Sequence, residues 1–392
     1  MEGSQEFFEA LRSHWEKKLP FVAYRDLAGK EVNIKALLQA DTQLNKVVDF
    51  SESGFVFAPF DNSRDIILFP VNNSQEITTV FNERDNYNPH QKSGNNTTET
   101  SEGKKAHLRL VELGIDAIKA GGLEKVVLSR KEILQAENQD VIEIFKRLLK
   151  KYPDAFVYIW YHPGIGLWLG ASPETLLKVE RNRVKTMALA GTKKYSGENE
   201  VEWGQKEKDE QQIVTDIILK GLQKTCTHLE TTGPYTTRAG NLLHLRTDIS
   251  GEIISPIDNS SIAAMHRVTA ENLKNLIYSI HPTPAICGHP IDKARQFILT
   301  NENYDREFYT GYLGELNMKK VVKRSVTRRN TENLAYGSML VQTSLFVNLR
   351  CMKLEKTGAV LFVGGGITKD SIPEAEWEET NNKAGTMKAV LL

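Results

Sequence analysis

The sequence predicts an α+β fold built on large antiparallel sheets, and two observations indicate it. Short apolar runs bounded by turn-forming residues recur along the chain, and such runs are typical of strands. The helical stretches interrupt these runs without a regular alternation, so a repeated βαβ unit is not expected. The 392 residues are enough for one large domain or two ordinary ones, with a core that can enclose a deep pocket.

The N-terminal part combines one helix with two strands. Residues 1–21 have an amphipathic pattern with early acidic residues, which predicts a helix and not a secretory signal. Residues 54–60 and 65–71 read as strands, with Asp61-Asn62-Ser63 as the turn between them. The polar segment at about 88–104, rich in Asn, Thr, Ser and Gly, is the best loop candidate.

Strands dominate the rest of the chain. A helix at 107–120 ends at Gly121-Gly122, a usual stop signal. A second helix is expected at 207–223, where Ile213, Ile217 and Leu222 fall near one stripe. The expected strands are 125–134, 155–162, 166–172, 176–180, 184–191, 344–355 and 359–366.

Composition excludes several functional classes. Fifty basic and fifty acidic residues balance, so neither nucleic acid nor an anionic membrane is an expected partner. No apolar run approaches the roughly 18 residues that a spanning helix needs. Three widely spaced cysteines exclude a disulfide framework and a CxxC metal site, and they favour a reducing cytoplasm. The chain has no phosphate-binding GxxxxGK loop and no HExxH motif.

A carboxylate pair near the C-terminus is the sharpest candidate site. If this segment is helical, Glu376, Glu379 and Lys383 share one face. Two carboxylates on adjacent turns suit Mg²⁺, although a solvated face with a Glu–Lys pair has the same spacing. The apolar strand before them ends in Gly364–Gly366, where backbone N–H groups could approach an anion. An ordinary turn or bulge would use the same glycines.

Two further carboxylates are candidates. Glu210 lies three residues after Glu207 and borders an apolar helix face, where it must be paired or bind metal. Ser172 and Pro173 predict a helix start, with Glu174 in its first turn. The helix dipole would lower the pKa of Glu174, so an acid role requires burial or a neighbouring carboxylate.

Three basic side chains complete the candidates. Lys125 opens a strand, where it is either an edge residue with its head in water or a buried base. Arg350, placed on the strand 344–355, could bind a carboxylate in bidentate fashion or pair with a structural glutamate. His244 fits a hydrogen-bonded core histidine better than a catalyst.

Taken together, these segments resemble the chorismate-utilising enzymes, which include isochorismate, salicylate, anthranilate and aminodeoxychorismate synthases. The resemblance covers residues 105–392. It implies two packed, mostly antiparallel sheets with outer helices in a single large domain, as in anthranilate synthase. Residues 1–104 would be the N-terminal portion of that fold and 105–392 the chorismate-binding catalytic region. It rests on KVVLSR, GASPETL, ALAGTKK, EKDEQQIVTDI, NLLHLRTDISG, HPTPAICG, YDREFYTGYLG, LFVNLRCMKL and GGGITKDSIPEAEWEET.

The resemblance also assigns roles to the candidate residues. Mg²⁺ would be held by Glu210, Glu376 and Glu379 and would bind the ring carboxylate of chorismate. Lys125 matches the base that activates water, and Glu174 matches the acid that protonates the departing hydroxyl. The remaining substrate-binding positions are Ala190, Gly191, Thr192, His244, Ala285, Arg350, Gly364, Gly365, Gly366 and Lys383.

Three positions favour the isochorismate synthase branch, an isomerase. Lys125 with Ala190 and Ala285 favours water attacking C2 with loss of the C4 hydroxyl, and not an amine. A salicylate synthase shares the lysine and then eliminates pyruvate, so it is the alternative, followed by an inactive scaffold protein. No glutamine amidotransferase subunit is expected, and the resemblance suggests a cytoplasmic monomer. Menaquinone, siderophore and salicylate pathways all stay open.

Overall fold

The computed structural model describes residues 3–27, 33–81, 101–135, 139–197, 201–254, 268–322 and 338–391. In these ranges the chain forms two nine-stranded sheets and seven α-helices. Each strand pairing in them is antiparallel, as in the pairs of β7 with β18 and of β11 with β13. The expected α+β fold is confirmed.

The first sheet has the order β14-β7-β18-β17-β9-β8-β1-β2-β6. The N-terminal strands therefore form one edge, and the strands that carry the candidate site lie near the other. The bounds are β1 Phe21–Asp26, β2 Asn33–Gln39, β6 Ser74–Val80, β7 Lys125–Gln135, β8 Phe156–His162, β9 Gly166–Ser172, β14 Gly288–His289, β17 Cys351–Glu355 and β18 Gly358–Ile367.

The second sheet has the order β12-β13-β11-β10-β16-β15-β4-β5-β3. Its N-terminal strands again lie at one edge, so the first part of the chain extends both sheets. The bounds are β3 Asn45–Lys46, β4 Gly54–Ala58, β5 Ile67–Pro70, β10 Thr175–Glu180, β11 Arg183–Lys194, β12 Cys226–Ala239, β13 Leu242–Ile253, β15 Tyr312–Val322 and β16 Ser338–Val347.

An aromatic layer joins the two sheets. Trp160 and Trp168 come from the first sheet, and Phe57 and Phe346 come from the second. The rings of Phe57 and Trp160 lie 5.0 Å apart. Burying such large rings provides much of the free energy that holds the sheets together.

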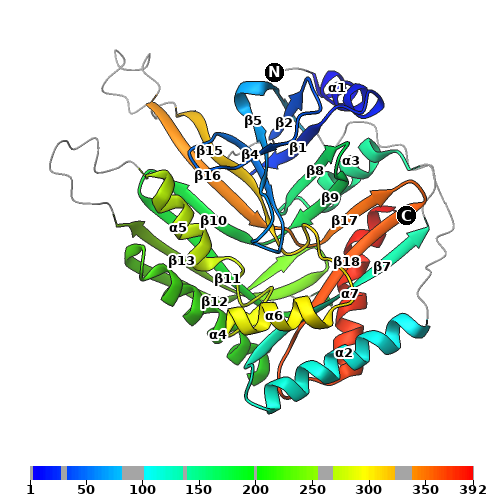
Figure 1. Cartoon of the computed structure of the whole chain (residues 1–392), viewed down its shortest axis with the longest axis vertical. Helices are drawn as coiled ribbons and strands as arrows, with labels where there is room; N and C mark the ends of the chain where they lie inside the picture. The colour runs from blue at the N-terminus through cyan, green and yellow to red at the C-terminus, as the bar shows by residue number, and fades with distance from the viewer. Residues whose placement is uncertain are drawn as a thin grey trace.

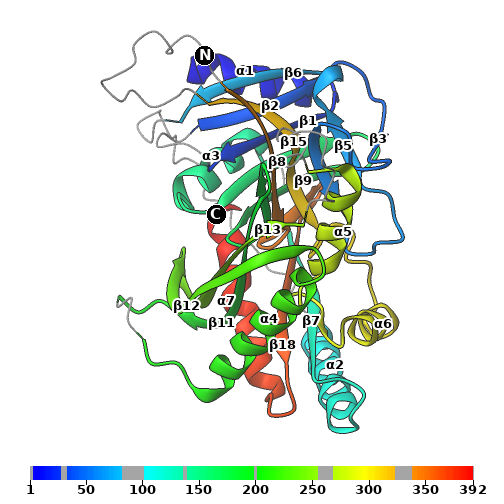
Figure 2. The ribbon, with the colours of Figure 1, turned by 90° about the vertical axis from the view of Figure 1, so that its left-hand side faces the viewer.

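The helices cover the outer faces of the sheets. α1 (Ser4–Glu16), α3 (Val141–Lys151) and α7 (Pro373–Leu391) share a core with the first sheet. α4 (Gln205–Leu222) and α5 (Ala270–Ile280) share one with the second. α2 (Ser101–Lys119) and α6 (Ile291–Asn301) pack at the β7 edge. Figure 1 and Figure 2 show α1 at one end of the molecule and α2, α4 and α7 toward the other.

The helix expected at 207–223 is confirmed as α4, but of the three residues predicted for its stripe only Leu222 is buried. Val214, Ile218 and Leu222 are buried, whereas Ile213 and Ile217 are only half-buried. The loop expected at 88–104 is wrong at its end, because residues 101–104 already belong to α2. Residues 88–100 lie outside the described residues.

The helix start predicted at Ser172 is wrong. Ser172 ends β9 in the first sheet, and Thr175 begins β10 in the second. Leu176 and Leu177 are buried in the core of the second sheet, and this burial outweighs the local capping preference. Glu174 therefore lies in a crossing between the sheets and not in the first turn of a helix.

The single strand predicted at 344–355 is also wrong, because β16 and β17 belong to different sheets. The chain crosses between them at Asn348–Arg350, and Arg350 has a positive φ of 47°. The buried Asn348 fixes this crossing: it donates to the Phe308 carbonyl at 2.8 Å and accepts from the Tyr158 hydroxyl at 2.7 Å. Both mispredicted segments are thus crossings that deliver a candidate site residue between the sheets.

Candidate functional site

A cleft of about 1080 Å³, including its solvent-open mouth, lies between the two sheets. Its walls come from the ends of β11 and β13, the glycine run of β18, the start of α4 and the middle of α7. Twelve of the fifteen predicted site residues line it: Glu174, Ala190, Gly191, Thr192, Glu210, His244, Ala285, Arg350, Gly364, Gly366, Glu379 and Lys383.

The other three predicted residues lie directly behind this wall. Lys125 is 1% exposed, and its ammonium bonds to the Glu210 carboxylate at 2.6 Å. Glu376 is 3% exposed. Gly365 lies beside Glu376, since a Cβ at Gly365 would be 3.4 Å from Glu376 Oε2. The fold therefore brings the whole predicted set to one place.

The glycine triplet forms neither a turn nor a bulge. Gly364 and Gly366 continue β18 in register with β7. A Cβ at Gly366 would lie 2.7 Å from Glu210 Oε1 and 3.0 Å from Lys125 Cε, closer than packed atoms allow. The glycines make room for side chains that reach over the strand from α4, α7 and β7.

Three ion pairs fill this space. Lys125 pairs with Glu210 at 2.6 Å, Lys206 with Glu376 at 3.1 Å, and Lys383 with Glu379 at 2.7 Å. Each carboxylate predicted to bind metal is thus held by a lysine.

The three pairs act on one another. Burial lowers the pKa of Lys206, but the charges of the three carboxylates outweigh it and the pKa is raised. Burial raises the pKa of Glu210, yet the three lysines hold it below its usual value. The pKa of Glu376 is raised, mainly by burial and further by the charge of Glu379. The six groups form one electrostatic cluster, hereafter the Lys–Glu cluster.

The Lys–Glu cluster has the ligand chemistry that Mg²⁺ prefers. Its acceptors are carboxylate oxygens from two helices, with open cleft beside them for water and substrate oxygens. In the parts of the chain that the structure describes, no three acidic, histidine or cysteine side chains converge on one point as a metal site would require. The carboxylates would have to turn away from their lysines to share an ion.

Glu174 is an acid that keeps its proton at neutral pH. The side chain is 2% exposed. Burial raises the pKa of Glu174 to about 8, against the opposing charge of Lys125. From the sequence, Glu174 could act as an acid only if burial or a neighbouring carboxylate raised its pKa. The fold provides the burial.

Arg350 and His244 form the opposite side of the cleft. Arg350 Nη2 donates to His244 Nε2 at 2.6 Å, and His244 Nδ1 bonds to the Gly191 carbonyl at 2.8 Å. Burial, with the charge of Arg350, lowers the pKa of His244 to about 3, so the ring is neutral. This assigns the proton to Nδ1. The expectation from the sequence, a hydrogen-bonded core histidine, agrees with this geometry.

Arg350 carries a charge that no acidic side chain among the described residues neutralises. Burial lowers the pKa of Arg350 to about 10, so the guanidinium stays charged. Its other bond goes to the Ala239 carbonyl at 3.0 Å. Within the described ranges no carboxylate pairs with it. A buried cation that faces a cleft without a counter-ion suits an anionic ligand.

Sequence reasoning missed several residues of the cleft. Lys206 lies four residues before Glu210 on one helix face, a spacing that could have revealed it. Tyr309 and Thr310 line the cleft from a segment that was noted only for its resemblance. Ile286 and Phe362, which lie in a resemblance motif and an expected strand, line it as well, as does Met387, which no sequence signal marks.

Comparison with known proteins identifies the family. A family model described as chorismate binding enzyme matches residues 60–329, and a second model of the same description matches residues 335–389. The chain belongs to the chorismate-binding enzymes. The resemblance inferred from the sequence is confirmed.

Curated relatives within the chorismate-binding enzymes include several isochorismate synthases. The chain is 27% identical to isochorismate synthase MenF of Escherichia coli over 72% of its length, and 29% identical to isochorismate synthase DhbC of Bacillus subtilis over 71%. It is 30% identical to a putative isochorismate synthase of Aeromonas hydrophila over 72%. The matches span 59%, 65% and 65% of these relatives' own lengths.

Solved structures of chorismate-binding enzymes share the two-sheet fold. A putative 2,3-dihydroxybenzoate-specific isochorismate synthase, DhbC from Bacillus anthracis, superposes with a TM-score of 0.72 at 21% identity and covers 98% of this chain and 99% of that one. Anthranilate synthase component I from Streptococcus pneumoniae gives 0.59 at 16% identity, covering 94% and 90%. No helix in the described ranges is long and apolar enough to cross a membrane.

Proposed function

We propose that this chorismate-binding enzyme is a magnesium-dependent isochorismate synthase, which isomerises chorismate to isochorismate. The observation that carries the proposal is that Glu174, an acid that burial keeps protonated, lines the cleft and feels the charge of Lys125, which lies directly behind the cleft wall. An acid and a potential base at one cleft suit the loss of one hydroxyl and the addition of another. The relatives named isochorismate synthases support the same reaction.

Substrate binding would use both sides of the cleft. The uncompensated guanidinium of Arg350 would bind the enolpyruvyl carboxylate, next to backbone groups of Gly364–Gly366. Glu210, Glu376 and Glu379 would hold Mg²⁺, which when bound would orient the ring carboxylate and screen its charge. The substrate would thus be held by its two carboxylates, with its ring between them.

The chemistry would exchange one hydroxyl for another. Glu174 donates its proton to the C4 hydroxyl, which leaves as water. A second water molecule adds at C2, and Lys125 takes its proton, so the product is an isomer of the substrate. Lys125 can take that proton only as a neutral amine, so its ammonium, which donates to Glu210, must first release a proton to solvent.

Two small side chains support water as the nucleophile. Ala190 and Ala285 line the cleft and carry no group that could attack the ring or bind an amine. Because no amine donor is consumed, we also propose that the protein works without an amidotransferase subunit, as a monomer in the cytoplasm. Size-exclusion chromatography with light scattering tests the monomer: a mass near 44.2 kDa supports it, and a dimer mass contradicts it.

The decisive experiment incubates pure protein with chorismate and Mg²⁺ and without ammonia or glutamine. Chromatography of the products should show isochorismate and no pyruvate. Stoichiometric pyruvate with salicylate would identify a salicylate synthase instead. Absence of turnover with bound chorismate would identify a binding protein of the same fold.

A further inference from the structure

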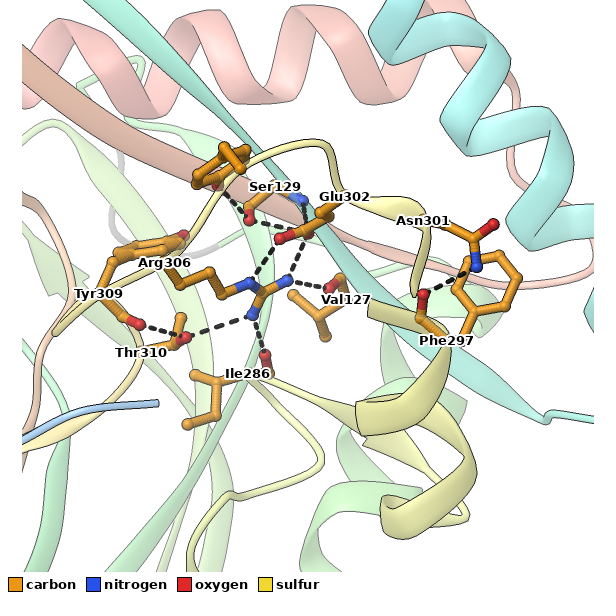
Figure 3. A network of polar contacts seen from close by, with 10 residues as sticks. Val127, Ser129, Ile286, Phe297, Asn301, Glu302, Arg306, Tyr309 and Thr310 are labelled. Atoms are coloured by element: carbon orange, nitrogen blue, oxygen red, sulfur yellow. Dashed lines mark hydrogen bonds and ion pairs between the residues drawn. The ribbon is translucent and has the colours of Figure 1, made fainter. Parts of the chain in front are cut away.

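A buried ion pair lies behind the cleft wall, at the end of α6. Arg306 Nη2 and Nε donate to the two carboxylate oxygens of Glu302 at 2.6 and 2.8 Å. Both side chains are almost fully buried. Neither residue lines the cleft, so the pair cannot touch substrate directly. Figure 3 shows the guanidinium at the centre of a network that joins several segments of the chain.

Arg306 holds three segments that do line the cleft. Nη2 donates to the Val127 carbonyl of β7 at 2.8 Å. Nη1 donates at 3.2 Å to the Ile286 carbonyl and at 3.2 Å to Thr310 Oγ1. Val127, Ile286 and Thr310 are all cleft residues. One side chain therefore ties together three parts of the wall that are far apart in the sequence (Figure 3).

Glu302 anchors the same strand a second time. Its Oε1 accepts from the Ser129 amide at 2.7 Å and from the Ser129 hydroxyl at 2.9 Å. β7 is thus held at Val127 by Arg306 and at Ser129 by Glu302. Lys125 lies on this strand two residues before Val127, and Ala285 immediately precedes Ile286. Lys125 and Ala285, two of the three positions that favour water as the nucleophile, thus lie within two residues of a clamped backbone group.

We propose that Glu302 and Arg306 are positioning residues. They fix the position of Lys125 relative to the loop that carries Ala285. This inference rests on the proposed function. Stability alone does not require such a pair, because a buried ion pair can often be replaced by apolar residues without loss. An apolar pair could not make the directed bonds to Val127, Ile286, Thr310 and Ser129. Only a planar guanidinium presents donors on several sides at fixed angles.

The test compares Arg306→Lys with a matched buried ion pair elsewhere. Lysine keeps the charge but lacks the planar guanidinium with its several donors, so it cannot bond to Val127, Ile286 and Thr310 at once. We expect kcat on chorismate to fall at least about 10-fold, since small misplacements of reacting groups are costly. KM should change by less than about threefold, because Arg350, Glu376 and Glu379 are not clamped by this pair. Glu315→Gln, which breaks a buried carboxylate's bonds to Tyr24 and Lys35 outside the cleft, should leave kcat unchanged.

Amide hydrogen exchange gives a readout that does not depend on turnover. Peptides covering residues 125–131 and 283–288 should exchange faster in Arg306→Lys and at the wild-type rate in Glu315→Gln. Wild-type exchange and kcat in Arg306→Lys would overturn the inference, as would an equal rise in exchange throughout the protein. If the wild-type protein does not convert chorismate, the proposed function fails, and the exchange pattern still decides whether the clamp exists.

A milder variant keeps the test valid if Arg306→Lys does not fold. Ser129→Ala removes one hydroxyl bond to Glu302 and leaves the ion pair itself intact. We expect a fall in kcat of roughly threefold with unchanged KM. A Ser129→Ala protein with wild-type kcat and wild-type exchange at 125–131 would count against the clamp.

Discussion

The ammonium of Lys125 and the carboxylate of Glu210 lie 2.6 Å apart beneath the glycine run of β18. Lys125 comes from the first sheet, and Glu210 comes from the helix that covers the second. The lysine is the proposed base and the carboxylate is a proposed metal ligand. Because the same carboxylate would bind the cation, a cation at Glu210 would weaken the bond to the Lys125 ammonium and favour the neutral amine that a base requires.

Lys125→Ala should lose catalysis while the protein still folds. We expect kcat to fall at least about 100-fold, the usual contribution of a positioned base. Chromatography of chorismate incubations gives the rate. Lys353→Ala removes a lysine that pairs with Glu307 at 2.7 Å outside the cleft and should keep the wild-type rate. Near-full activity in Lys125→Ala would remove Lys125 from the mechanism.

Glu174 should give the reaction a basic pH limit. Because the pKa of Glu174 is raised to about 8 by burial, the acid is protonated at neutral pH and loses its proton as the pH rises through 8. We therefore expect kcat to decline above about pH 8. Glu174→Gln should lower kcat by about 100-fold or more and abolish that limb of the profile. An unchanged limb would assign it to another group.

The same group makes the stability of the protein depend on pH. The pKa of Glu174 is higher in the folded chain than its usual 4.5, so the folded state binds the proton more tightly than the unfolded state. This contribution is complete below pH 4.5 and is lost as the pH rises to about 8. Glu174→Gln should flatten the fall of Tm across this range. A parallel fall in both proteins would contradict the shifted pKa.

The carboxylate positions could be predicted in part. The periodic pattern of α4 predicts a helix that carries Glu210. The i,i+3 spacing of Glu376 and Glu379 places them on one face once α7 is helical, a condition that the sequence left open. The segments that could not be predicted are the crossings at Glu174 and Arg350. Their conformation depends on which sheet each neighbouring strand joins, and local preferences at Ser172 contain no such information.

The protonation state of Glu174 and the ion pairs of the carboxylates could not be predicted from the sequence either. The raised pKa of Glu174 arises from burial by segments distant in the chain, and the lysine partners of the carboxylates include Lys206, which comes from another helix than Glu376. The resemblance named the residues of the site. The Glu379–Lys383 spacing predicts one lysine partner, and only the fold shows that Lys125 and Lys206 hold the other two carboxylates.

Lys206 should compete with Mg²⁺ for the Lys–Glu cluster. It is the most exposed of the three lysines, with 44% of its side chain accessible, so it can move away from Glu376 into solvent. Removing one positive charge near the cation should tighten Mg²⁺ binding by about 1 kcal/mol, roughly fivefold. Calorimetric titration of Lys206→Met measures this. Lys208→Met, on the same helix but away from Glu376, should bind Mg²⁺ like the wild type.

Chelation tests the cation requirement itself. EDTA should abolish isochorismate formation, added Mg²⁺ should restore it, and Mg²⁺ should raise Tm because it binds the folded state. Activity that is indifferent to EDTA would eliminate the proposed metal site.

Arg350→Met should weaken substrate binding without weakening the fold. Loss of a charged hydrogen bond to the substrate carboxylate should raise KM about 10-fold or more. Tm should not fall much, because the buried guanidinium has no carboxylate partner among the described residues and its desolvation is costly. Arg25→Met provides the contrast, since buried Arg25 donates to the Tyr152, Leu149 and Ala155 carbonyls. That variant should lose Tm and keep KM.

Gly366→Ala should disable the site through a single methyl group. The added Cβ would lie 2.7 Å from Glu210 Oε1 and 3.0 Å from Lys125 Cε, so the ion pair must move. We expect kcat to fall at least about 10-fold and Mg²⁺ affinity to fall with it, because both groups lose their positions. The fold should persist, since the methyl meets the ends of long side chains and no backbone.

Gly385→Ala is the matched control for this methyl group. A Cβ at Gly385, on helix α7, would meet nothing within 4 Å. Alanine there should stabilise the protein by about 0.5–1 kcal/mol through helix propensity and leave kcat unchanged. Thermal unfolding and chorismate kinetics distinguish the two variants. Equal kcat in both would show that the space over β18 is not what the Lys125–Glu210 pair requires.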